Sequence, residues 1–113
     1  MQNTKLRSKE MWSKYQNSPK QSGCFLCKAS RMREYKHWYI TPNNFPYDNV
    51  ADKQDMLVIK RHVGSLSDLT VAESIELSDI TRELDYDTIM LNFPDAQSVK
   101  GHLHFHLVKW IRA

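Results

Sequence analysis

The chain has 113 residues and a formal net charge of +3, and 41% of its residues are hydrophobic, 26% charged and 11% aromatic. This composition predicts one folded domain with an apolar core, and the three glycines and four prolines exclude collagen-like and low-complexity proteins. No apolar run approaches the roughly 18 residues that a membrane span needs, so we expect a soluble protein with no membrane partner.

The charge is uneven along the chain. Residues 1–22 carry five basic side chains and one acidic side chain, which leaves the remainder slightly acidic. A surface for nucleic acid should be basic across the fold, so nucleic acid is not predicted as a partner. We expect a basic, loosely ordered N-terminal arm at 1–22, with a short helix from Lys9 to Tyr15, and a domain at 23–113. The arm lacks the apolar segment of a secretory signal, which favours a cytoplasmic location.

The first predicted strands flank a loop. Residues 36–41 combine aromatic and β-branched side chains and precede Pro42, which is typical of a strand. Residues 43–49 contain asparagines and a proline, which favour a turn. Residues 56–59 form a short apolar run of strand length.

One helix is well marked. Thr70 and Glu73 have the spacing of a capping box, in which the hydroxyl accepts a hydrogen bond from the first turn and the carboxylate accepts one in return. Leu77, Ile80 and Leu84 then recur at helical spacing. A helix of about four turns should therefore pack this stripe against a sheet.

Two further strands are predicted at 88–93 and 103–108. Strands thus precede and follow one principal helix, and there is no regular alternation of strands with helices. The predicted class is α+β, with a mainly antiparallel sheet and one principal helix packed on it.

The two cysteines form a Cys-x-x-Cys pair, Cys24 and Cys27. In a chain without a predicted export signal, this spacing favours a metal site or a redox pair over a disulfide framework. A tetrahedral zinc site needs two more ligands, which the chain offers as histidines. The alternatives are two thiols without a metal, or a thioredoxin-like pair, for which the expected strand–helix–strand context is missing.

Three of the five histidines fall in one short segment. Because side chains alternate along a strand, His102, His104 and His106 should share one face while the apolar residues between them enter the core. Such a row favours one of two chemistries. Two or three imidazoles could bind a catalytic metal ion, or one imidazole could act as a nucleophile toward phosphorus, helped by its neighbours.

Residues 102–108 resemble the signature of the histidine triad family, in which histidine and apolar residues alternate and two apolar residues close the motif. The resemblance extends to the strand, basic turn and histidine at 56–63. It also includes the asparagine-containing turn at 43–47, which is similar to one in the related galactose-1-phosphate uridylyltransferases, and residues 97–99. Two departures are Gly101, an extra residue before the motif, and Ile59, which stands where the family usually has proline.

The resemblance implies a histidine-triad fold and a nucleotide substrate. It implies that His104 attacks the α-phosphorus to form a nucleotidyl-histidine, and that His106 contacts the phosphate oxygens or the bridging atom. The backbone carbonyl of His102 would hold the near nitrogen of His104. For substrate binding, it implies Asn43 at the ribose, and Asn92 and Ser98 near the phosphate.

The Cys-x-x-Cys pair resembles that of zinc-bearing family members. In these, the resemblance implies a structural zinc ion held by Cys24, Cys27, His62 and His102. A closed four-ligand site has no open position for water, so the metal would brace His102 and position His104 without performing the reaction.

The leading hypothesis is therefore a nucleotide hydrolase or transferase that acts on phosphoramidates, dinucleoside polyphosphates or adenylylated groups. One alternative is a non-catalytic nucleotide-binding or adaptor module on the same fold. Another is a metallohydrolase with catalytic zinc on the histidine row. The resemblance also implies a homodimer.

Overall fold

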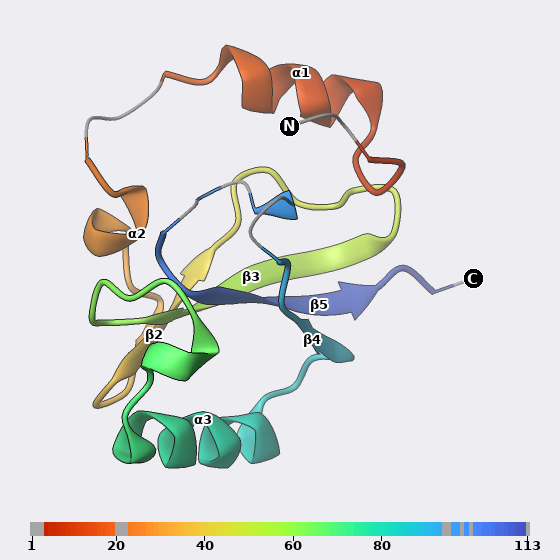
Figure 1. Cartoon of the computed structure of the whole chain (residues 1–113). Coiled ribbons are helices and arrows are strands. Elements are labelled where there is room, and N and C mark those ends of the chain that lie inside the picture. The colour runs from red at the N-terminus through yellow and green to blue at the C-terminus, as the bar shows by residue number, and fades with distance from the viewer. Residues whose placement is uncertain (1–3, 20–22, 94–95, 98, 100, 113) are drawn as a thin grey trace.

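A five-stranded antiparallel sheet forms the centre of the molecule (Figure 1). The computed structural model describes residues 4–19, 23–93, 96–97, 99 and 101–112. The strand order is β1-β2-β3-β5-β4, and every neighbouring pair is antiparallel. The predicted α+β class is confirmed. The strands are β1 (Arg33–Glu34), β2 (Trp38–Pro42), β3 (Ala51–Ile59), β4 (Thr88–Met90) and β5 (His104–Trp110).

Helices lie on both sides of this sheet. In Figure 1, α1 lies above the sheet and α3 below it, and the short α2 lies at one side. None of the helices in the described ranges is long and apolar enough to span a membrane. The helices are α1 (Lys9–Asn17), α2 (Phe25–Lys28) and α3 (Val71–Glu83), and the 3-10 turn η1 lies at Leu66–Asp68.

The principal helix, α3, begins where its sequence predicts. The Thr70 hydroxyl accepts a hydrogen bond from the Glu73 backbone N–H, and the Glu73 carboxylate accepts one from the Thr70 N–H, which confirms the capping box. Ile80 is buried in the main core cluster, and Leu77 and Leu84 pack against that cluster. The predicted stripe therefore faces the sheet.

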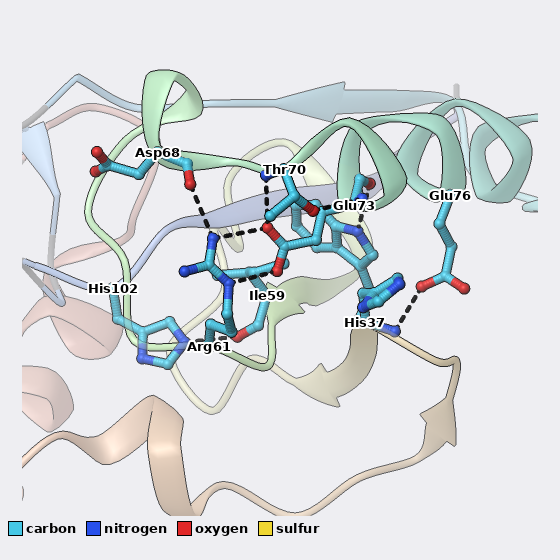
Figure 2. Close-up of polar contacts among 9 residues, drawn as sticks. His37, Ile59, Arg61, Asp68, Thr70, Glu73, Glu76 and His102 are labelled. Carbon is cyan, nitrogen blue, oxygen red and sulfur yellow. Dashed lines mark hydrogen bonds and ion pairs between the residues drawn. The ribbon is translucent and has the colours of Figure 1, made fainter.

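A bidentate ion pair joins the start of α3 to the end of β3 (Figure 2). Arg61 donates from Nε and from Nη2 to the two carboxylate oxygens of Glu73, both at 2.8 Å, and Nη2 also donates to the Asp68 carbonyl. The Glu73 side chain is 2% exposed, whereas that of Arg61 is 50% exposed. This pair fixes the turn at 60–62 against the helix, and His62 belongs to that turn.

The strands β3, β4 and β5 differ in their bounds from the ranges that the sequence predicts. β3 begins at Ala51 rather than near residue 56, because buried polar side chains at its start have partners. Gln54 accepts a hydrogen bond from the Tyr47 N–H, and Asp55 accepts one from the Tyr86 hydroxyl. β4 ends at Met90, short of the predicted residue 93, and β5 runs on to Trp110.

The described part of the N-terminal arm packs on the loop at 43–49. Ser8 caps α1 by accepting from the Met11 N–H, and its own N–H and hydroxyl donate to the Asp48 carboxylate at 2.7 and 2.5 Å. The Asn49 N–H donates to the Leu6 carbonyl. The boundary at residue 22 and the loose order of the arm stay predictions.

We predict that Glu73→Gln removes a pH-dependent part of the stability. The hydrogen bonds from Arg61 outweigh burial and lower the pKa of Glu73 from 4.5 to about 2. Its contribution is therefore complete above the unfolded-state pKa of 4.5 and is lost as the pH falls toward 2. The exposure of Arg61 to solvent limits the expected loss at pH 7 to roughly 1–2 kcal/mol.

Denaturant unfolding of wild type and Glu73→Gln between pH 7 and pH 2 measures this contribution. Their difference should shrink toward zero in acid. Asp79→Asn, an exposed change on the same helix, is the control. A difference that stays constant down to pH 2 would contradict the assignment to ionised Glu73.

Candidate active site

Four side chains with metal-ligand atoms meet around α2. Cys24 caps this helical turn and Cys27 lies within it, while His62 follows β3 and His102 precedes β5. Their ligand atoms all lie within 4.8 Å of one another. The structure thus brings together all four residues that the sequence predicts as metal ligands.

The separations within this group fit a tetrahedral site. The Sγ–Nδ1 distance is 3.3 Å from Cys24 to His102 and 3.3 Å from Cys27 to His62. Zinc–sulfur and zinc–nitrogen bonds of about 2.3 and 2.0 Å at a tetrahedral angle place sulfur and nitrogen roughly 3.5 Å apart. The group could therefore hold a metal ion of this size.

The ring of His102 is oriented for metal binding. Its Nε2 lies 2.6 Å from the Ile59 carbonyl, which accepts the N–H because a carbonyl has no proton to give (Figure 2). Nδ1 is left with a lone pair directed at the thiols of Cys24 and Cys27. Burial lowers the pKa of His102, which favours the neutral ring that binds metals.

The histidine row separates the core from a cleft, as the alternation along β5 predicts. Leu103, Phe105 and Leu107 belong to the main core cluster. His104 and His106 line a cleft of about 880 Å³ on the other face of the sheet. Side chains of α1 and of the loop at 43–45 also line this cleft.

One hydrogen bond determines which nitrogen of His104 carries the proton. Nδ1 lies 2.8 Å from the backbone carbonyl of His102, so it donates an N–H to that oxygen. In the neutral ring, Nε2 then holds a lone pair. Burial lowers the pKa of His104, so the neutral form is favoured at pH 7. The contact that the resemblance implied between His104 and the His102 carbonyl is present.

The opposite tautomer follows for His106. The Tyr47 backbone N–H donates to Oε1 of Gln54 at 2.7 Å, which turns the Gln54 amide nitrogen toward His106. That Nε2 donates to Nδ1 of His106 at 3.0 Å, so His106 carries its proton on Nε2. Burial, then the charges of His104 and Arg7, lower the pKa of His106 to about 3, which keeps the ring neutral. Nε2 of His104 therefore carries a lone pair and Nε2 of His106 carries a hydrogen-bonding N–H, and the two ring centroids lie 5.3 Å apart.

The predicted substrate-binding residues differ in where they lie relative to the cleft. Asn43 lines the cleft, and its Nδ2 lies 3.5 Å from Nδ1 of His106. Asn92 donates to the Tyr47 hydroxyl at 2.9 Å and is not among the described residues that line the cleft. Ser98 lies outside the described residues.

Sequence reasoning missed Arg7, Tyr47 and Gln54, which the structure brings to His106 or its cleft. Gln54 could have been found, because alternation from Met56 back along a longer β3 places Gln54 on the same face. Arg7 has no such signal, because its place depends on how the arm packs on the loop at 43–49.

Comparisons with known proteins support the fold. No family model matches the chain. A glutaminyl-peptide cyclotransferase of Drosophila melanogaster is 37% identical over 71 residues, which cover 58% of this chain and 20% of that protein. The match thus spans about a fifth of the length of that relative.

Two solved structures share the architecture. A HIT family hydrolase from Legionella pneumophila superposes with a TM-score of 0.60 at 21% identity, covering 80% of this chain and 95% of that one. A histidine triad protein from Clostridium difficile gives a TM-score of 0.53 at 21% identity, covering 84% and 96%. The chain therefore carries the histidine-triad signature on the fold of the histidine triad proteins.

Proposed function

We propose that this protein is a nucleotide hydrolase or transferase that cleaves at the α-phosphorus of nucleoside phosphate conjugates. The observation that carries the proposal is the pair of opposite tautomers facing one cleft. His104 offers a lone pair on Nε2, and His106 offers an N–H on Nε2. A nucleophile beside a hydrogen-bond donor for the phosphoryl group is an arrangement that favours substitution at phosphorus.

In the proposed first step, Nε2 of His104 attacks the α-phosphorus. A phosphorus–nitrogen bond forms, the bond from phosphorus to the leaving group breaks, and the leaving group takes a proton from a water molecule in the cleft. The His102 carbonyl stabilises the positive charge that develops on the His104 ring, because Nδ1–H donates to it. Water, or another acceptor, then displaces the nucleotide from His104, which restores the neutral ring.

The Nε2–H of His106 is proposed to donate a hydrogen bond to a phosphoryl oxygen or to the leaving atom. Asn43, which lines the same cleft, is proposed to bind the ribose. Asn92 supports the Tyr47 hydroxyl, and the Tyr47 ring packs 5.3 Å from that of His106, so we propose a positioning role for Asn92. Ser98 stays a predicted phosphate ligand.

We predict that His104→Ala abolishes turnover of an adenosine phosphoramidate, with a loss of at least about 10³-fold, because the attacking atom is removed. Mass spectrometry of acid-quenched wild type should detect a nucleotidyl adduct on the protein, absent in the variant. His37→Ala removes a histidine that lies outside the cleft and is the control. Equal turnover by wild type and His104→Ala would reject the mechanism.

The hydrogen bond from Gln54 gives a second prediction. In Gln54→Glu, the new carboxylate can only accept at the position where the amide N–H donates, so His106 should shift its proton from Nε2 to Nδ1. Loss of this hydrogen-bond donor should lower turnover by about 10²-fold. Imidazole 15N chemical shifts report the tautomer, and Asn17→Asp on the exposed end of α1 controls for added charge. An unchanged tautomer with unchanged rate would contradict this account.

We further propose that the metal group, which consists of Cys24, Cys27, His62 and His102, holds a structural zinc ion. Two thiolates and two imidazoles are ligands that zinc prefers, and a four-ligand site leaves no place for a reactive water. The ion would brace the segment that ends in His104. Thiols must stay reduced to bind metal, which favours a reducing compartment such as the cytoplasm. We also propose that the protein forms a homodimer.

The rival metallohydrolase places zinc on His102, His104 and His106. The hydrogen bonds oppose it, because Nε2 of His102 is bound to Ile59 and Nδ1 faces the thiols. No nitrogen of His102 is then left for an ion shared with the other two rings. The non-catalytic binding module is the other rival, and it predicts nucleotide binding without any adduct on His104.

We predict that Cys24→Ser loses the bound zinc and unfolds at a temperature lower by on the order of 10 °C, because metal binding adds to the stability of a small domain. His104→Ala should keep about one zinc per chain. Elemental analysis and thermal unfolding measure both effects, with His37→Ala as the control. Zinc retained in Cys24→Ser and lost in His104→Ala would support the rival metallohydrolase.

A further inference from the structure

Arg7 is a buried charge beside the histidines. Its side chain comes from the N-terminal arm, is 6% exposed and lines the cleft with His104 and His106. No carboxylate of the described residues lies within ion-pairing distance of its guanidinium. Asp48, which faces the arm, accepts the N–H and hydroxyl of Ser8, and its charge interacts with Arg7 from beyond ion-pairing distance. A largely buried guanidinium without a direct ion pair is costly, which points to an anionic partner that is not part of the chain.

The guanidinium is held in a fixed orientation. Its central carbon lies 5.3 Å from the ring centroid of Tyr15 and 4.9 Å from that of Tyr47. Nε donates to the Phe45 carbonyl at 2.8 Å. These contacts use the planar faces and one of the five N–H donors. No described residue accepts from the two terminal nitrogens, which reach the solvent of the cleft, because no fully buried side-chain nitrogen among the described residues lacks a partner.

The positive charge lies on the side of the cleft that carries His106. The ring of Tyr47 contacts both the guanidinium and the His106 ring, whose centroid is 5.3 Å away. After burial and the charge of His104, Arg7 is the third cause of the low pKa of His106. An anion that reaches His106 therefore also reaches the field of Arg7.

We propose that Arg7 is a ligand-binding residue whose terminal N–H groups donate hydrogen bonds to a phosphoryl group of the nucleotide in the cleft. The N-terminal arm thus supplies part of the binding site. The identity of the ligand rests on the proposed function, whereas the anion site rests on the burial of Arg7 and its lack of a direct ion pair among the described residues. The terminal N–H groups form a planar fork that suits two phosphoryl oxygens.

The charge on the ligand should then control affinity. Binding of AMP and of adenosine, which differ by the phosphoryl group, is measured by calorimetry for wild type, Arg7→Gln and Lys9→Gln. Arg7→Gln should lower the preference for AMP over adenosine by about 10- to 100-fold and leave adenosine binding nearly unchanged. Lys9→Gln removes the same charge from an exposed position on α1 and should change the preference less than about twofold.

A second readout does not depend on the stability of the variant. The side-chain Nε–H signal of Arg7 in wild-type protein, labelled at arginine 15N, should shift on addition of AMP or inorganic phosphate and stay in place with adenosine. Arg7→Lys keeps the charge without the planar fork, and its preference for AMP should lie between those of wild type and Arg7→Gln.

The outcomes separate this proposal from the proposed function. An equal preference in wild type and Arg7→Gln, a signal that does not respond to AMP, or no AMP binding to wild type at millimolar concentration would each overturn the anion site. A lowered preference in Arg7→Gln without any turnover that depends on His104 would support the anion site and reject nucleotidyl transfer.

Discussion

The hydrogen bond from Nδ1 of His104 to the His102 carbonyl is the contact on which the candidate site depends. It leaves the lone pair of His104 on Nε2 and joins the histidine row to the metal group, because the same residue, His102, gives its carbonyl to one and its ring to the other. The ring is in turn tied to the Ile59 carbonyl at the end of β3. Any movement of the metal group therefore moves the carbonyl that orients His104.

The protein places polar groups in its interior and satisfies them by contacts between distant segments. Gln54 links the Tyr47 backbone to His106, and Arg61 links the end of β3 to Glu73 on α3. Among the described residues, no buried side-chain nitrogen or oxygen is left without a hydrogen-bond partner. Such networks hold side chains in one orientation, which is what a site with two different tautomers requires. Arg7 differs because no described carboxylate lies within ion-pairing distance of it, and this is the basis of its proposed role in binding an anionic ligand.

The two faces of the sheet have separate tasks. The face that packs on α3 holds the apolar residues of β5, and its packing contributes to stability. The opposite face holds His104 and His106 and is covered in part by the N-terminal arm, whose residues line the cleft. Because side chains alternate along β5, each change of one residue in register would exchange the core with the cleft. The register of β5 is therefore specified by the residues on both of its faces.

The sequence by itself determined the features that depend on local periodicity and spacing. These are the capping box at Thr70, the alternation along β5, the Cys-x-x-Cys pair and the α+β class. Only the tertiary structure decided which segments meet. Gln54 reaches His106 through the pairing of β3 with β5, and Arg7 reaches the cleft through the docking of the arm. No pattern within either segment encodes its partner, because such contacts join residues that are far apart in the chain.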